Sequence, residues 1–281
     1  MVIHNKSITT KGVPMTLTRP ALVVVTDLDG TLLDHHHYDF VAALPALERL
    51  RKHRIPVVLN TSKTRAEVQQ WRAQLDNHHP YVIENGGAIL WPTEQGERVQ
   101  SLGKPRHAIL EVLARIQTQL SLTLEGFSHW TTDELMTHTG LAQGPAEQAM
   151  ARRYSEPLLW PKEQPLERFS QALAEHDLQG LRGGRFLHVQ GQHDKSDALG
   201  PLREHYHHEL GQAPVIVALG DGDNDRAMLA QADWAVVIRS PNHSPLQVDA
   251  KAGRKTMLPA GIGPFGWNQA IHHILDHYQF D

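Results

Sequence analysis

Short apolar runs, most of them followed by polar or glycine residues, recur along the chain and predict buried β-strands. They lie at 21–25, 55–59, 81–84, 215–219 and 234–238. Apolar residues three or four positions apart predict helices between them, at 40–53, 64–75, 196–210 and 224–231. Strands that alternate with helices are typical of an α/β fold, whose parallel sheet binds ligands beyond the carboxyl ends of its strands. We therefore expect the functional residues along the edge of the sheet where the carboxyl ends of the strands lie.

The middle of the chain has a different pattern, rich in helices and poor in long apolar runs. Helices are predicted at 105–120, 131–139, 145–153 and 165–176, with short strand-like pieces at 121–124 and 185–190. Thr64-x-x-Glu67 and Thr131-x-x-Glu134 have the spacing of capping boxes, which start helices,. The pattern predicts an α+β domain inserted at 89–188, a core made of 21–88 and 189–281, and a polar extension at 1–20.

Composition narrows the possible functions. The 281 residues include 27 basic and 31 acidic ones, a net charge of −4 that gives no support to nucleic-acid binding,. No run of about 18 apolar residues predicts a membrane span, and the first residues have no apolar stretch of a signal peptide. The lack of cysteine excludes disulfides, thiolate metal sites and a cysteine nucleophile,. We expect a cytoplasmic protein with neither nucleic acid nor membrane as a partner.

The segment Asp27-Leu28-Asp29-Gly30-Thr31 carries the strongest chemical signal, because it directly follows the first predicted strand. Two carboxylates at such a turn can hold a hard cation through oxygen. One carboxylate could instead attack phosphorus while the other handles protons. A solvated acidic turn is the alternative.

A second acidic segment, Gly220-Asp221-Gly222-Asp223-Asn224-Asp225, also follows a strand and begins a helix. An EF-hand loop is the rival interpretation, since three aspartates occupy its positions 1, 3 and 5. It fails because Arg226 stands where glycine is needed and Ala232 where a bidentate glutamate is needed,. The segment is better explained as part of a site at the strand ends, where its carboxylates complete a magnesium site with the first pair.

Two further residues could serve a phosphoryl group. Thr61 follows the strand at 55–59 and could bind phosphoryl oxygens, or it could only cap a helix,. Lys195 precedes a helix and could neutralise charge on phosphate and on an aspartate, or it could be an ordinary exposed lysine,. The run His35-His36-His37 has no zinc-site spacing and predicts surface histidines,.

The order of these segments along the chain indicates a protein family more specifically than any one segment does. The chain runs strand-DLDGT, strand-NTSKT, an insertion, DKSDAL and strand-GDGDND. This resembles the haloacid dehalogenase-like phosphohydrolase superfamily, whose four motifs occur in this order. The resemblance implies a Rossmann-like parallel sheet core with an inserted α+β cap domain of the C2B type.

Within that superfamily the chain is most similar to the mannosyl-3-phosphoglycerate phosphatase family. The similarity rests on VIENGGAIL at 82–90, RRYSEPLLW at 152–160, GGRFLHVQGQHDKSDAL at 183–199 and ALGDGDND at 218–225. Ser62 and Lys63 replace the glycine-arginine pair that is common in other sugar phosphatases with this cap, which is itself a point of similarity to the mannosyl-phosphoglycerate group.

The resemblance implies a role for each motif. Asp27 would attack phosphorus and form an aspartyl-phosphate, and Asp29 would protonate the leaving alkoxide and then activate water. Thr61 and Lys195 would bind phosphoryl oxygens.

It also implies magnesium as the cofactor. The ligands would be the carboxylates of Asp27 and Asp221 and the backbone carbonyl of Asp29. Asn224 and Asp225 would support the metal or the lysine.

The cap would select a small phosphoester substrate, expected to be mannosyl-3-phosphoglycerate. An anionic glycerate favours guanidinium partners, and sugar hydroxyls favour mixed donors and acceptors. The substrate-binding candidates are Ser62, Lys63, Arg153, Ser155, Glu156, Arg185 and His188, with Arg152 beside them in the same motif. Surface ion pairs are the alternative for each cap residue. A broad-range sugar phosphatase, a phosphomutase and a binding protein without activity stay open, and so does the oligomeric state.

Overall fold

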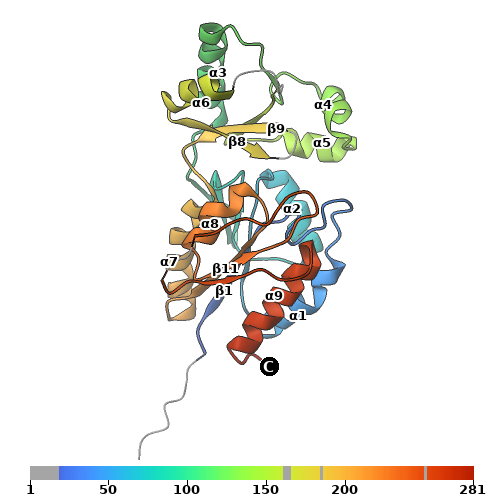
Figure 1. The fold of residues 1–281 in the computed structure, drawn as a ribbon, viewed down its shortest axis with the longest axis vertical. Coiled ribbons are helices and arrows are strands. Elements are labelled where there is room, and N and C mark those ends of the chain that lie inside the picture. Colours follow the sequence, from blue (N-terminus) through green and yellow to red (C-terminus); the bar gives the residue numbers. More distant parts are fainter. Residues whose placement is uncertain (1–18, 161–165, 184–185, 250–251) are drawn as a thin grey trace, which may run out of the picture.

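The computed structural model describes residues 19–160, 166–183, 186–249 and 252–281, which form two parts of different architecture. Figure 1 shows the smaller, all-antiparallel sheet with its helices above the larger sheet with its own helices. The α/β architecture expected from the sequence is confirmed. Within the described residues, no helix has both the length and the apolar character needed to cross a membrane.

The larger sheet has eight strands in the order β12-β11-β10-β1-β2-β3-β4-β5, and the first six run parallel. β4 and β5 form an antiparallel hairpin at one edge. The strands are β1 (Leu22–Thr26), β2 (Val57–Asn60), β3 (Tyr81–Ile83), β4 (Ala88–Thr93), β5 (Gly96–Ser101), β10 (Val215–Gly220), β11 (Trp234–Val237) and β12 (Lys255–Met257).

Both faces of this sheet are covered by helices, which is why its central strands are apolar throughout. Leu22 and Val24 of β1 pack on one face, and Val23 and Val25 pack on the other. The first face is covered by α1 (Leu44–Lys52), α2 (Arg65–Gln74) and α9 (Gly263–His277), and the second by α7 (Leu199–Leu210) and α8 (Arg226–Gln231). Three 3-10 turns lead into helices, at Val41–Ala43, Lys195–Ala198 and Asp223–Asp225.

The smaller sheet has the order β6-β7-β9-β8. Its strands are β6 (Glu125–Gly126), β7 (Ser155–Leu159), β8 (Leu178–Gly183) and β9 (Phe186–Gly191). Leu187 and Val189 of β9 pack with α3 (Arg106–Leu120) and α6 (Leu166–Ala174). Phe186 packs instead with α4 (Thr132–Thr139) and α5 (Gln143–Met150). Because strand side chains alternate between faces, His188 shares the face of Phe186.

Both predicted capping boxes are present. Glu67 N donates to Thr64 Oγ1 over 3.3 Å, and Thr64 N donates to Glu67 Oε2 over 2.8 Å, at the start of α2. Thr131 and Glu134 make the reciprocal pair at the start of α4. These local interactions fix the helix starts independently of the tertiary packing.

Three expected boundaries differ from the structure. The strand expected at 121–124 is wrong, since only Glu125–Gly126 pairs with β7. The glycine- and proline-rich stretch 259–266 predicts a loop before a C-terminal helix, but α9 already begins at Gly263, because Pro264 suits the first turn of a helix,. The boundary expected at residue 89 falls inside β4, whose hairpin extends the larger sheet.

The sequence pattern did not predict the hairpin, because β5 is polar and mostly exposed, as suits an edge strand,. We therefore propose that the core runs to Ser101 and resumes after Gly191, and that residues between them form the cap. The expected N-terminal extension lies almost wholly outside the described residues.

Candidate active site

The acidic segments meet because β10, β1 and β2 are neighbours in the sheet and end at the same edge. Asp27 directly follows β1 and Asp221 directly follows β10. Carboxylate oxygens of Asp27, Asp221 and Asp225 lie within 4.8 Å of one another, and all three residues are buried. The structure thus brings together residues that lie nearly two hundred positions apart in the chain.

Lys195 lies at the centre of this cluster and is fully buried. Its Nζ donates to Asp27 Oδ1 and to Asp225 Oδ1, each over 2.6 Å. Burial alone would lower the pKa of Lys195, but the carboxylates of Asp225 and Asp27 outweigh it and raise the pKa. Asn60 holds the lysine backbone by donating from Nδ2 to Lys195 O over 2.8 Å. The lysine is therefore charged and fixed in place.

Asp225 shapes the site rather than offering a free ligand. Its Oδ2 accepts the backbone N–H groups of Asp221 and Gly222, each over 3.0 Å, while Oδ1 accepts Lys195. A Cβ atom on Gly220 would lie 2.4 Å from Asp225, so glycine is required where β10 passes this side chain. Asp225 thus orients the loop that carries Asp221.

Asp29 pairs with a second lysine. Lys63 Nζ lies 2.8 Å from Asp29 Oδ2 and 3.9 Å from Glu67 Oε1, while Asp29 Oδ1 is buried and has no hydrogen-bond partner among the described residues. Burial would lower the pKa of Lys63, but the carboxylates of Asp29 and Glu67 outweigh it and raise the pKa. Lys63 therefore contributes charge at the second aspartate.

The donor set fits a divalent cation. Among the described residues, the carboxylates of Asp27, Asp29, Asp221 and Asp225 surround the ammonium groups of Lys63 and Lys195, and two histidines lie beside Asp221. Burial raises the pKa of Asp27 well above its usual range; Lys195 opposes this rise, and the other three aspartates add to it. A cluster of hard carboxylate oxygens with fewer ammonium groups than carboxylates suits a divalent ion such as magnesium.

His35 is part of the site, contrary to the prediction of a surface histidine. Its Nε2 lies 3.2 Å from Asp221 Oδ2, and the hydrogen bond with Asp221 raises the pKa of His35. Thr31 Oγ1 donates to Asp221 Oδ1 over 2.9 Å, and His243 Nε2 lies 3.6 Å from Oδ2. A Cβ atom on Gly30 would lie 2.3 Å from the His35 ring. The loop folds back over the glycine, which sequence spacing does not reveal.

A cleft of about 540 Å³ separates these residues from the cap. Its core side includes Asp27, Asp29, Ser62, Lys63 and Asp221. Its cap side, here called the cap ceiling, consists of Phe127, Thr139, Leu141, Ala149, Arg152, Leu181, Arg182, Phe186 and His188. Among the residues that the structure describes, the ceiling carries two guanidinium groups and no carboxylate.

His188 and Arg152 are the most enclosed polar groups of the ceiling. Burial, and then the charge of Arg152, lower the pKa of His188 to about 3, so the ring is neutral near pH 7. His188 Nδ1 and Arg152 Nε are buried and have no hydrogen-bond partner in the described chain. Both residues line the cleft, although these two atoms have almost no accessible surface.

The structure does not bring every predicted cap residue to this cleft. Arg153 is exposed and borders another pocket. Ser155 and Glu156 are fully buried, and Glu156 accepts hydrogen bonds from Arg106 and from Ser128 N. Arg185 lies outside the described residues. The ceiling contains instead Arg182, in the short strand β8, which the periodicity of the sequence did not indicate.

Two other predicted site residues, Thr61 and Asn224, make hydrogen bonds around the carboxylate cluster. Thr61 is fully buried, and its hydroxyl accepts the N–H of Lys63 over 3.3 Å. Asn224 Nδ2 donates to Asn85 Oδ1 over 3.1 Å, which links the second acidic loop to the turn after β3. These contacts fix the loops that surround the carboxylates.

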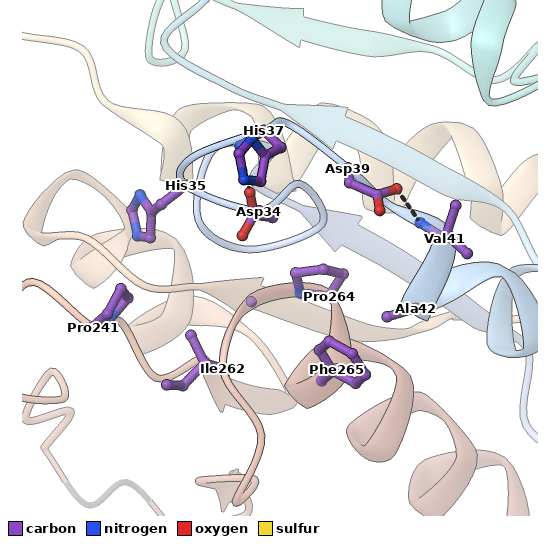
Figure 2. A pocket seen from close by; sticks show the side chains of 11 residues that line it. Asp34, His35, His37, Asp39, Val41, Ala42, Pro241, Ile262, Pro264 and Phe265 are labelled. Atoms are coloured by element: carbon purple, nitrogen blue, oxygen red, sulfur yellow. Dashed lines mark hydrogen bonds between the residues drawn. The ribbon is translucent and has the colours of Figure 1, made fainter.

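Another pocket, also of about 540 Å³, adjoins the site and shares His35 with the cleft. Figure 2 shows it between the loop that carries Asp34 and His35 and the start of α9. Val41 and Phe265 are largely exposed there. The pocket contains none of the predicted site residues, whereas Asp27, Asp29 and Asp221 line the cleft under the cap.

Comparison with known proteins agrees with this geometry. The family model of haloacid dehalogenase-like hydrolases matches residues 24–155. A glucosyl-3-phosphoglycerate/mannosyl-3-phosphoglycerate phosphatase from Persephonella marina is 32% identical over 92% of this chain and 98% of its own. A protein of the same name from Methanococcoides burtonii is 33% identical over 90% and 97%. The chain belongs to the haloacid dehalogenase-like hydrolases.

Solved structures show the same fold in this superfamily. A phosphatase from Bacteroides thetaiotaomicron has a TM-score of 0.67 at 15% identity, over 97% of this chain and 100% of that one. A sugar phosphatase of subclass IIB has a TM-score of 0.60 at 15% identity, over 92% and 100%. The resemblance to mannosyl-3-phosphoglycerate phosphatases found in the sequence is confirmed. The protein is a phosphoric monoester hydrolase, and the phosphatases of its superfamily generally use a divalent metal.

Proposed function

We propose that the protein is a magnesium-dependent phosphatase that hydrolyses mannosyl-3-phosphoglycerate to mannosylglycerate and phosphate. One observation carries the proposal: buried Asp27, which pairs with Lys195, faces across one cleft a cap ceiling whose described residues include two arginines and no acid. Asp27 with Lys195 suits phosphoryl transfer, and the arginines of the cap ceiling suit an anionic leaving group. The names of the two relatives support the same substrate class.

The residues of the core divide the reaction between them. Asp27 is the nucleophile, and its attack forms an aspartyl-phosphate as the ester bond breaks. Lys195 offsets the repulsion between this carboxylate and the phosphate and, with Thr61, binds phosphoryl oxygens. Asp29 gives a proton to the leaving alkoxide and then takes one from the water that attacks the aspartyl-phosphate and releases phosphate from Asp27. Lys63 balances the negative charge of the Asp29 carboxylate whenever the proton has left it.

Magnesium would be held by Asp27, Asp221 and the backbone carbonyl of Asp29, with Asp225 orienting the loop. When bound, it would neutralise charge on the phosphoryl oxygens. Asp27, Asp221 and Asp225 are buried, so their carboxylates would hold the ion away from most of the solvent.

The cap ceiling supplies specificity in this proposal. Arg152 and Arg182 offer guanidinium groups to the glycerate carboxylate. Phe127 and Phe186 offer an apolar surface to the sugar ring, and the neutral His188 can accept or donate a hydrogen bond to a hydroxyl,.

A substrate panel tests the proposal. Phosphate release is measured for mannosyl-3-phosphoglycerate, glucosyl-3-phosphoglycerate, mannose 6-phosphate and glucose 6-phosphate, with magnesium and with a chelator. We expect magnesium-dependent turnover and a higher kcat/KM for the two glycerate esters. Equal kcat/KM values for glycerate esters and hexose phosphates would overturn the assigned substrate, and isomerised sugar phosphate without free phosphate would indicate a mutase.

A further inference from the structure

Glu84 is a fully buried carboxylate in the turn after β3, outside the acidic cluster. Its oxygens accept from three consecutive cap residues: Arg153 N at 2.8 Å, Tyr154 N at 3.0 Å and Ser155 Oγ at 2.6 Å. All three donors are neutral, so within the described chain the carboxylate is satisfied by hydrogen bonds alone. Burying a carboxylate costs free energy, and these hydrogen bonds offset that cost.

The backbone of Glu84 is attached to the other side of the site. Its N–H donates to Lys63 O over 3.0 Å, and the next residue, Asn85, donates to Thr61 O over 2.9 Å. Glu84 has a φ of +48°, a left-handed conformation that non-glycine residues seldom adopt,. The residue thus connects residues 61–63, here called the phosphate loop, with the start of β7.

The same cap segment carries a residue of the ceiling. Arg152 Nη1 donates to Ser155 Oγ over 3.0 Å and to Ser62 O over 3.2 Å. Ser155 therefore stands between Glu84 and Arg152, donating to the first and accepting from the second. The position of the Arg152 guanidinium over the phosphate loop depends on this chain of contacts.

We propose that Glu84 is a positioning residue that docks the cap segment 152–155 on the phosphate loop and so holds Arg152 over the leaving group. The inference rests on the proposed function, because it matters only for a substrate that reaches the cap. A carboxylate is needed since each of its oxygens accepts a backbone N–H. A glutamine would turn its NH₂ group toward one of these donors and leave it unpaired.

The test compares two substrates in the full-length protein: mannosyl-3-phosphoglycerate, which reaches the ceiling, and acetyl phosphate, whose leaving group is small. Glu84→Gln is expected to lower kcat/KM roughly 10- to 100-fold for the first and less than roughly 3-fold for the second. Ser155→Ala removes one of these contacts. It should lower the ratio of kcat/KM for mannosyl-3-phosphoglycerate to kcat/KM for acetyl phosphate by a smaller factor. A merely structural role would lower both rates in proportion, which would overturn the proposal.

Tyr154→Phe is the matched control. It deletes a different contact across the same junction, the 2.7 Å hydrogen bond between Tyr154 and Ser101 Oγ, which has no link to Arg152. The ratio of kcat/KM for the two substrates should equal that of the wild type. A shift in this ratio as large as that of Glu84→Gln would overturn the proposal. If Glu84→Gln does not fold, Ser155→Ala decides by the same criterion. A wild type without preference for the glycerate ester contradicts the proposed function instead.

Discussion

Lys195 Nζ lies 2.6 Å from Asp27 Oδ1, although 168 residues separate the two in the chain. The lysine is fully buried and also pairs with Asp225, so it balances two carboxylates in a medium that solvates charge poorly,. The pair joins the first strand of the core to the segment that follows the cap. It therefore joins distant parts of the fold at the residue that we propose as the nucleophile.

Replacing this lysine should cost stability as well as activity. Lys195→Met leaves two buried carboxylates unpaired, and we expect the free energy of unfolding to fall by about 3–5 kcal/mol. Urea denaturation in the presence of a chelator measures it. Lys52→Met, at an exposed position of α1, is the control and should change stability by less than about 0.5 kcal/mol,. A loss below about 1 kcal/mol for Lys195→Met would contradict the structural role.

Asp27→Asn separates chemistry from folding. The amide keeps the shape of the side chain but cannot attack phosphorus, so phosphate release should fall by at least roughly 1,000-fold. The folded state should survive, because the substitution removes one of four crowded carboxylates and Lys195 keeps its partner Asp225. Phosphate release and thermal unfolding are measured on the same sample. Undiminished turnover would show that another group is the nucleophile.

Magnesium binding has a readout that does not depend on turnover. An ion that binds only the folded state raises the unfolding temperature. We expect millimolar magnesium to raise the unfolding temperature of the wild type and a chelator to reverse it. Asp221→Asn should abolish this shift, since it removes a proposed ligand. Asp223→Asn, in the same loop but outside the carboxylate cluster, should retain it. Equal shifts in both variants would place the ion elsewhere.

Arg182 and Arg153 offer a test of which guanidinium groups the substrate meets. Arg182 borders the cleft, whereas Arg153 is exposed beside another pocket. Arg182→Ala should raise KM for mannosyl-3-phosphoglycerate roughly 10-fold, because a charged hydrogen bond is lost. Arg153→Ala should leave KM within roughly 2-fold. The reverse result would restore the sequence-based prediction for Arg153 and contradict the cleft described here.

The sequence sufficed to predict the residues whose position follows from strand ends. Asp27 and Asp221 each come directly after an apolar run, and the carboxyl ends of neighbouring parallel strands must meet at one edge. Lys195 could be proposed only through the order of the motifs, since nothing local distinguishes it from an exposed lysine.

Other features depended on contacts that periodicity does not encode. His35 reaches Asp221 only because the loop after β1 folds back over Gly30. The hairpin β4–β5 is polar on its outer strand, so it carries no strong strand signal. Ser155 and Glu156 lie in a motif from which substrate binding was predicted. Their polar atoms instead form hydrogen bonds with residues elsewhere in the cap and core. Which polar group faces a cleft is decided by packing.

His188 gives a prediction for the dependence of stability on pH. Its folded pKa of about 3 lies below the ordinary value of 6.5, because burial, and then Arg152, disfavour the charged ring. As pH falls below 6.5 the unfolded chain binds a proton that the folded protein refuses, so stability is lost in acid. From pH 7.5 to 5.5 this group alone should cost about 1.4 kcal/mol. Urea denaturation of wild type and His188→Asn at both pH values isolates the effect, because all other histidines are common to both proteins. The variant should lose correspondingly less stability on acidification; an equal loss in both would show that the ring is charged or solvated in the folded state.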